Sequence, residues 1–337
     1  MAKIRTVTGD IEPGSVRNAM IHEHVLFDIV APDCGGNRNA EINALNRWQI
    51  DYFSNRDPSN AHQLDRGVAT SEMKAYKDDG GDLVVDQSAL GLARDPEGLR
   101  RAAIDSGVRI VAATGTYTAP YLDDKILSLD SSELGELFAR EILEGIGDFG
   151  IRAGIIGEIG CSWPLEEFER RALGAAARAQ RETGAAISVH PGRHPDACPE
   201  IIEILERHGA DLSRTILCHM DRTYPDGDGV LQLLQSGVNV EWDFFGIEQS
   251  HYWMGDLELP NDLDRLRIIR NLDDLGFGSR LLISQDICTK TRMKHWGGHG
   301  YGHILRNATA LMDRLEFDQT LTEKLLRLNP RRLLAIQ

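Results

Sequence analysis

The stretch Ile21-His22-Glu23-His24-Val25 decides the fold, because two histidines flank a single residue directly after an apolar approach. On an extended strand, residues i and i+2 project to one face, so both imidazoles can point at a common metal ion. Two side chains do not make such a site by themselves. We therefore expect the rest of the chain to supply further ligands.

Seven more apolar runs lead into a polar residue, as the first run does. The polar residues are Asp86, Thr114, Glu158, His190, His219, Asp243 and Asp286. Helical patterns lie between the runs at residues 61–77, 95–106, 131–146, 164–182, 195–208, 229–235 and 261–271, and two more at 301–315 and 321–328 finish the chain. Strands that alternate with helices are parallel and joined by right-handed crossovers. The sequence therefore predicts an α/β fold, a (β/α)₈ TIM barrel in which residues 1–337 form a single domain.

Two segments fall outside this alternation. Turn signals at Gly9-Asp10 and Pro13-Gly14 predict a short N-terminal β-hairpin within residues 4–20. Residues 27–60 are rich in Asn, Asp, Gly and Pro, and the segment is long for a structureless connection. We expect it to be a functional loop beside the site.

Composition limits the classes of partner. A hydrophobic content of 42% and a charged content of 26% are typical of a soluble globular protein. The net charge of −15 argues against nucleic acid or an anionic membrane as a partner, because both need a positive footprint. The N-terminus lacks the apolar core of a signal peptide, and the five scattered cysteines contain no C-x-x-C. We expect a cytoplasmic protein with reduced thiols.

Chemistry in a barrel of this type lies at the carboxyl ends of the strands. There the candidate ligands converge: His22, His24, Glu158, His190, His219 and Asp286. Any one of them alone could be a satisfied structural residue, but six at matching positions predict a site. Four imidazoles and two carboxylates suit divalent ions, most of all zinc, with manganese, cobalt or nickel as substitutes. Two ions that share a bridging carboxylate and a bridging water fit this number of ligands, and a single-metal site is the alternative.

These residues resemble the phosphotriesterase group of the amidohydrolase superfamily over essentially the whole chain. The stretches Gln285-Asp286-Ile287-Cys288-Thr289-Lys290-Thr291-Arg292 and Gly297-Gly298-His299-Gly300-Tyr301-Gly302-His303-Ile304 resemble the phosphotriesterase-related proteins in particular. The resemblance implies that one ion is bound by His22, His24 and Asp286 and a more exposed ion by His190 and His219. Glu158 would bridge them, where many relatives have a carboxylated lysine. Relatives are commonly homodimers, so the resemblance also implies a homodimer.

The chain departs from the organophosphate-cleaving relatives at two positions. Those relatives share a proton relay that runs from the aspartate of the last barrel strand to a histidine after the seventh strand. Phe244 stands where that histidine would be, and Arg222 replaces its acidic partner. The departures argue against efficient phosphotriester hydrolysis. Asp286 remains the expected catalytic residue, because it can accept a proton from the bridging water and donate it to the leaving group.

The loops after the strands predict the kind of substrate. Despite the acidic total, they carry Arg193, Arg222, Lys290 and Arg292. An arginine fork matches carboxylate, phosphate or sulfonate, so we expect a small molecule with an anionic group. The alternative is that these cations neutralise nearby acids. Tyr117 could hydrogen-bond the substrate, a placement that resembles the lactone-hydrolysing relatives, or it could be a packing residue.

The leading hypothesis is therefore a binuclear hydrolase in which a metal-bridging hydroxide attacks a carbonyl carbon. The bond that it cleaves would be that of a lactone or ester, or of an N-acyl amide. One alternative is a phosphotriesterase or phosphodiesterase that uses the same site. An alternative of another class is a metal-bound binding protein without turnover. Asp86 and Asp243 are expected to orient loops or histidines, and His299 and His303 to anchor loops.

Overall fold

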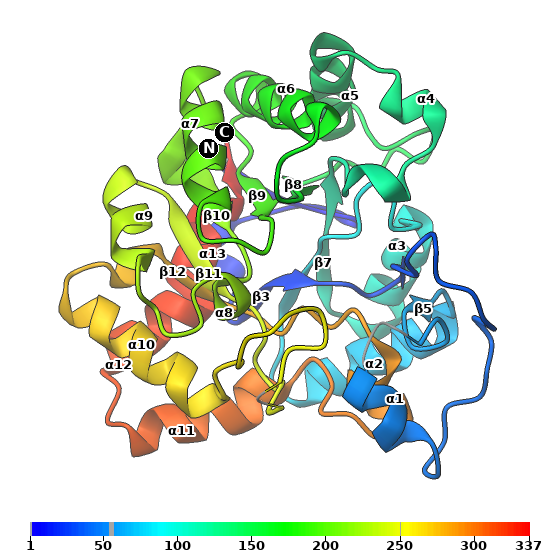
Figure 1. Ribbon diagram of the computed structural model, residues 1–337, viewed down its shortest axis with the longest axis vertical. Helices are drawn as coiled ribbons and strands as arrows, with labels where there is room; N and C mark the ends of the chain where they lie inside the picture. Colours follow the sequence, from blue (N-terminus) through cyan, green and yellow to red (C-terminus); the bar gives the residue numbers. More distant parts are fainter. Residues whose placement is uncertain (1, 54–56, 250) are drawn as a thin grey trace.

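Eight parallel strands form one sheet at the centre of the molecule (Figure 1). The computed structural model describes residues 2–53, 57–249 and 251–337 of the chain. Strands that follow one another in sequence are hydrogen-bonded neighbours, which is the predicted (β/α)₈ arrangement. In chain order they are β3 (Ala19–Glu23), β6 (Leu83–Asp86), β7 (Arg109–Thr114), β8 (Ile155–Gly160), β9 (Ile187–His190), β10 (Thr215–Leu217), β11 (Asn239–Trp242) and β12 (Leu281–Ile283).

The first and last strands of this sheet, β3 and β12, are joined where their carboxyl ends meet. Ser284 Oγ accepts hydrogen bonds from the backbone N–H groups of Ile21 and His22, each at 2.9 Å. The backbone N–H of Asp286 donates to the carbonyl of His22 at 3.1 Å. The closure of the barrel therefore lies beside the residues that are predicted to bind metal.

Helices cover the outside of the barrel (Figure 1). Those between the strands are α2 (Arg66–Asp78), α3 (Pro96–Ser106), α5 (Ser131–Leu143), α6 (Glu167–Thr183), α7 (Ala197–Arg207), α9 (Val230–Ser236) and α10 (Asp262–Asp274). Shorter α-helices are α1 (Arg47–Phe53), α4 (Asp124–Leu127), α8 (Met220–Thr223), α11 (Thr309–Arg314), α12 (Gln319–Glu323) and α13 (Asn329–Leu334). Single 3₁₀ turns span Pro13–Ser15, Ala119–Tyr121, Leu212–Arg214, Gly278–Arg280, Lys290–Arg292 and Lys294–Trp296.

Several predicted helix boundaries were wrong. The helix expected from residue 61 begins at Arg66, because the Asp65 carboxylate accepts the N–H groups of Gly67 and Val68 and so caps it. The helix expected from Pro164 begins at Glu167. The two helices expected at 301–315 and 321–328 are each interrupted by a π-helical turn, at Ile304–Ala308 and Lys324–Leu328.

The segment 27–60, expected to be a functional loop beside the site, contains regular structure. It begins with β4 (Phe27–Asp28), which pairs with β5 (His62–Gln63), and it contains α1. Residues 54–56 of the segment lie outside the described residues. Ile29, which directly follows β4, lines the central pocket, so this part of the segment does lie beside the site.

The N-terminal hairpin is present and closes the barrel end that faces away from the site. It consists of β1 (Lys3–Thr6) and β2 (Gly9–Ile11), and β1 also pairs with β13 (Ala335–Ile336), so the two chain ends are adjacent (Figure 1). Alternate residues of β6 face opposite ways. Leu83 and Val85 pack inside the barrel, and Val84 packs under the helices. Within the described residues, we find no helix with the length and apolar character needed to cross a membrane.

Replacing Ser284 with alanine would leave the N–H groups of Ile21 and His22 without their acceptor inside the barrel. Each buried unpaired group costs about 1–3 kcal/mol, so we expect the free energy of unfolding in urea to fall by about 2–4 kcal/mol. Ser71→Ala is the control, because the exposed Ser71 hydroxyl donates to the Gly67 carbonyl within its own helix, α2. Equal losses of stability in the two variants would contradict the closing role of Ser284.

Candidate metal centre

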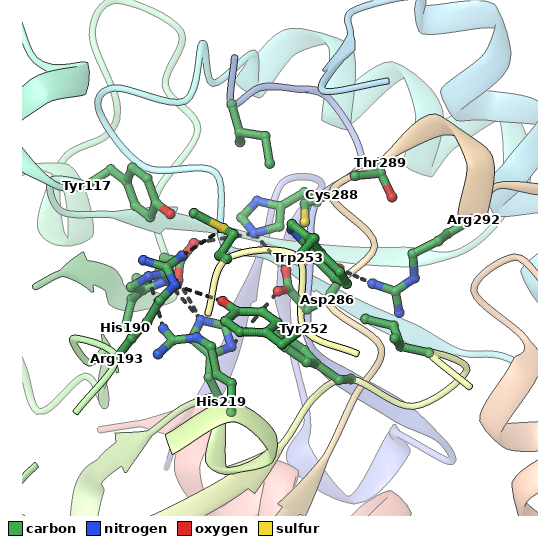
Figure 2. A pocket seen from close by; sticks show the side chains of 17 residues that line it. Tyr117, His190, Arg193, His219, Tyr252, Trp253, Asp286, Cys288, Thr289 and Arg292 are labelled. Carbon is green, nitrogen blue, oxygen red and sulfur yellow. Dashed lines mark hydrogen bonds and ion pairs between the residues drawn. The ribbon is translucent and has the colours of Figure 1, made fainter. Parts of the chain in front are cut away.

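The structure brings the six predicted ligand side chains together at the carboxyl ends of five strands. His22 lies within β3 and His24 directly after it, Glu158 lies within β8, His190 ends β9, and His219 and Asp286 lie shortly after β10 and β12. Figure 2 shows His190, His219 and Asp286 around one pocket. Three overlapping sets place their ligand atoms within 4.8 Å of one another: His22, His24 and Glu158; His22, His219 and Asp286; and Glu158, His190 and His219.

Glu158 is the centre of this cluster. Its carboxylate lies 2.9 Å from His190 Nδ1, 3.4 Å from His24 Nε2, 3.5 Å from His219 Nε2 and 3.7 Å from His22 Nε2. Burial alone raises the pKa of Glu158, but the facing histidines outweigh it and hold the pKa well below its usual range. The carboxylate is therefore ionised and reaches every histidine of the cluster.

Asp286 contacts three of the same histidines. Its Oδ1 lies 3.3 Å from His24 Nε2 and 3.7 Å from His22 Nε2, and its Oδ2 lies 3.9 Å from His219 Nδ1. Asp286 and His219 both have left-handed backbones, with φ of 45° and 59°. Residues other than glycine rarely adopt this conformation, and it often marks functional sites.

His22 shows that the cluster fits divalent ions. It is fully buried, and within the described part of the chain its Nε2, which faces Glu158 and Asp286, has no hydrogen-bond partner. A buried polar group without a partner costs free energy, and an ion between its Nε2 and the carboxylates of Glu158 and Asp286 would satisfy it. Imidazole nitrogens with carboxylate oxygens are donors that zinc prefers. The residues present therefore suit the group that the sequence predicted.

A deeper set of side chains is a weaker candidate. His22, Cys218, Glu241 and Asp243 also lie within 4.8 Å of one another. Burial raises the pKa of the Cys218 thiol far above its usual value, so the thiol stays neutral. Asp243 is occupied by His219. The side chains on the pocket side of His22 are therefore the stronger candidate for a metal site.

Neighbouring acids hold the histidines in place, as predicted for Asp86 and Asp243. Asp243 accepts hydrogen bonds from His219 Nδ1 at 2.8 Å and from the His219 backbone N–H at 3.0 Å. Burial raises the pKa of Asp243, but His219 and His22 outweigh it and lower the pKa below its usual value. Asp86 accepts the N–H of Ser88, whose hydroxyl lies 3.0 Å from His24 Nδ1. Such partners fix ring orientation in metal sites.

A pocket opens above the cluster. Apolar and aromatic side chains form much of its wall, namely Ile29, Phe244, Ile247, Tyr252, Trp253 and Met254. The residues from Phe244 to Met254 follow β11 in one segment. The pocket therefore places an apolar and aromatic wall next to the candidate ligands.

Three of the five predicted substrate-binding residues line this pocket close to His190. Arg193 donates from Nε to the hydroxyl of Tyr252 at 2.7 Å. Arg222 is buried, donates to the Pro191 carbonyl at 2.8 Å, and lies 3.1 Å from His190 Nε2. The ring of Tyr117 meets that of His190 edge to face at 5.1 Å. The structure thus places two guanidinium groups beside the exposed edge of the cluster.

The other two, Arg292 and Lys290, have different surroundings. Arg292 lines the pocket, but its guanidinium donates to the backbone carbonyls of Asp286, Gln285 and Phe245. These bonds hold the loop that carries Asp286. Lys290 is not among the pocket-lining residues, and its ammonium lies 5.3 Å above the ring of Trp296. Of the two histidines predicted to anchor loops, His299 contacts the carbonyl of Gly300, whereas His303 binds Asp262 at the start of α10.

Sequence reasoning missed the role of Glu23. Its buried carboxylate accepts hydrogen bonds from the backbone N–H groups of Gln285 and Ile287 and from Gln285 Nε2. Burial outweighs these bonds and raises its pKa to about 7. A charged residue inside an otherwise apolar strand was the signal that could have revealed it. Tyr252 gave no comparable signal, because its contact with Arg193 depends on how the segment after β11 folds.

Comparisons with known proteins agree with this geometry. The profile of the Phosphotriesterase family matches residues 2–334. The human protein named N-acetyltaurine hydrolase is 36% identical over 344 residues, which cover 99% of this chain and 98% of that protein. The crystal structure of a resiniferatoxin-binding protein from Rhodobacter sphaeroides superposes with a TM-score of 0.92 at 29% identity, covering 98% of this chain and 94% of the other.

A mutant of a phosphotriesterase-like lactonase from Deinococcus radiodurans superposes with a TM-score of 0.78 at 26% identity, covering 98% of this chain and 99% of the other. The family match spans nearly the whole chain, and the matched fold carries the clustered histidines and carboxylates at its strand ends. The chain belongs to the phosphotriesterase family and is a metal-dependent hydrolase.

Proposed function

We propose that the chain hydrolyses the N-acyl amide of a small molecule that carries a sulfonate or carboxylate group. The observation that carries this proposal is the position of Arg193 and Arg222 in the same pocket as the histidine and carboxylate cluster. The name of the human relative, N-acetyltaurine hydrolase, describes such a substrate, because taurine is an aminosulfonate. The amide would be cleaved at the cluster while the guanidinium groups bind the anion.

We assign His22, His24 and Asp286 to one divalent ion and His190 and His219 to a second, with Glu158 shared. Zinc suits these donors best, with manganese, cobalt or nickel as substitutes. When bound, the two ions would lower the pKa of a water and polarise the carbonyl of the substrate. The protein supplies the fixed orientation of the imidazoles through Asp243, Ser88 and Asp86.

Asp286 is the group that we assign to proton transfer. Burial raises its pKa, but the hydrogen bond to His24 and the neighbouring histidines outweigh it, so the pKa lies below its usual value and the carboxylate can accept a proton. Its side chain lines the pocket and so can also reach the leaving group. Amide cleavage needs a proton on the leaving nitrogen, and Asp286 is placed to deliver it.

Arg193 and Arg222 supply the recognition of the anion. A guanidinium offers paired N–H donors to sulfonate or carboxylate oxygens, and the burial of Arg222 strengthens such bonds. Arg222 donates a hydrogen bond to the Pro191 carbonyl, and Arg193 donates one to the Tyr252 hydroxyl. Both are fixed before substrate arrives, which reduces the entropy lost on binding.

Phe244 favours the carbonyl substrate over a phosphotriester. Its ring lies 5.5 Å from that of His219, on the wall of the pocket. A phenyl ring cannot transfer a proton, so a relay from Asp286 through this position is absent. We expect Asp286 to transfer protons directly between water and leaving group.

A substrate panel tests the proposed function directly. Zinc-loaded protein would be assayed with N-acetyltaurine, N-acyl amino acids, a series of lactones, and paraoxon. We expect the highest kcat/KM for the anionic N-acyl amides. Preferred lactone hydrolysis would move the assignment to a lactonase, and activity on paraoxon alone would overturn it in favour of a phosphotriesterase. Failure to hydrolyse any of them would favour a binding protein.

Replacing Glu158 with glutamine would remove the charge that all four histidines face. We expect the number of tightly bound ions to fall and kcat/KM for the best panel substrate to drop by about 10³-fold or more, which is on the order of 4 kcal/mol. Ion content would be measured by plasma emission spectroscopy after dialysis. Glu136→Gln, at an exposed carboxylate on α5, is the control and should change neither quantity. An unchanged ion content in Glu158→Gln would exclude Glu158 as a shared ligand.

Replacing Arg193 with glutamine separates anion recognition from chemistry. We expect kcat/KM for N-acetyltaurine to fall by about 10- to 100-fold, because a charged hydrogen bond to the sulfonate is lost. For the uncharged sulfonamide analogue of N-acetyltaurine, we expect kcat/KM of Arg193→Gln to stay close to that of the wild-type protein. Arg207→Gln, at an exposed site on α7, is the control. An equal loss on both compounds would show that Arg193 does not bind the anion.

A further inference from the structure

A buried group of ionisable side chains lies behind the metal centre, on the side of α10. We call it the Arg265 network, and it consists of Arg265, Asp221, Asp262 and His303. Arg265 and Asp221 are fully buried, and Asp262 and His303 are 3% and 9% exposed. None of them lines the pocket, so substrate does not contact them. Burying several charges is expensive unless each is paired, so the pairing here needs an explanation.

Arg265 is the hub of the network. Its Nε donates to Asp221 Oδ1, and its Nη1 donates to Asp262 Oδ1 at 2.7 Å. Nη1 and Nη2 also donate to the carbonyl of Ile247, each at 3.2 Å. His303 Nε2 donates to Asp262 Oδ2 at 2.6 Å. Burial raises the pKa of Asp262, but His303 and Arg265 outweigh it and lower the pKa to about 2.

The network holds the backbone at the end of β11. Asp221 Oδ2 accepts the N–H groups of Asp243 at 2.9 Å and Phe244 at 3.2 Å. Asp262 Oδ1 accepts the N–H of Gly246 at 2.9 Å. With the carbonyl of Ile247, four backbone groups between residues 243 and 247 are therefore bound by these three side chains. Such a segment has little freedom to shift.

Residues 243–247 contact the metal centre at one end and form part of the pocket wall. Asp243 accepts from both His219 Nδ1 and the His219 backbone N–H, and it lies 3.4 Å from His22 Nδ1. Phe244 and Ile247 line the pocket. A displacement of the backbone at Asp243 would therefore rotate or release the imidazole of His219.

We propose that Arg265 is a positioning residue of the metal centre: through Asp221 it fixes Asp243, and through Asp243 it fixes His219. The inference rests on the proposed function, because it concerns the affinity of the centre for its ions. Lysine cannot replace Arg265 in this role. A single ammonium cannot span Asp221, Asp262 and the Ile247 carbonyl, whereas the planar guanidinium contacts all three.

Zinc affinity of the full chain tests the proposal. Metal-stripped protein would compete for zinc with a chromophoric chelator. In Arg265→Lys we expect the affinity for at least one of the two ions to fall by about 10-fold or more, the size of effect seen when a partner of a metal-binding histidine is lost. Asp221→Asn, which keeps a carbonyl acceptor but not the charge, should weaken zinc binding in the same direction.

Two controls separate positioning from loss of stability. Arg267→Lys changes an exposed arginine of the same helix that pairs with Asp264, and its zinc affinity should stay at the wild-type value. Leu134→Ala removes a buried side chain of α5 and should lower the unfolding midpoint without weakening zinc binding.

The outcomes that overturn the proposal are distinct from failure of the proposed function. Wild-type zinc affinity in folded Arg265→Lys and Asp221→Asn would overturn it, as would an equal loss in Leu134→Ala. If neither network variant folds, Arg265 serves folding rather than positioning, and the proposal also falls. Wild-type protein that binds no zinc would instead remove the proposed function itself.

Discussion

The hydrogen bonds that join the first barrel strand to the segment after the last are the constraint on which the rest depends. Glu23, which lies between His22 and His24, accepts from the N–H groups of Gln285 and Ile287, and the N–H of Asp286 donates to the carbonyl of His22. These bonds fix residues from opposite ends of the sequence against each other. Without them, His22 and His24 would have no fixed relation to Asp286, and the cluster would lack one of its walls.

The two ends of the barrel have opposite physical character. Apolar side chains such as Leu83 and Val85 fill the end that the hairpin closes, where they stabilise the fold by leaving water. The other end holds imidazoles and carboxylates that are almost wholly buried. Burying such groups is unfavourable unless partners or ions compensate them. Burial of the apolar side chains therefore compensates the cost of burying the polar groups at the other end of the barrel. Bound divalent ions would stabilise those polar groups further.

Patterns that depend on local geometry could be predicted from the sequence. Apolar runs that alternate with helical patterns predicted eight strands in the correct order. Because the carboxyl ends of barrel strands carry the chemistry, His22, Glu158 and His190 could be predicted to lie in one site. What depends on tertiary packing could not be predicted. The basic loop residues looked equivalent, but Arg292 binds backbone carbonyls whereas Arg193 faces the pocket. The Arg265 network was missed because it joins α8 to α10, and only the folded chain shows that contact.

The measurement that bears most directly on the central claim is a crystal structure of the zinc-loaded protein with anomalous diffraction recorded on both sides of the zinc absorption edge. We expect two zinc peaks in the pocket. One should lie within bonding distance of His22, His24 and Asp286, the other of His190 and His219, with Glu158 in contact with both. A single peak, or peaks away from these side chains, would contradict the binuclear centre and the chemistry that we derive from it.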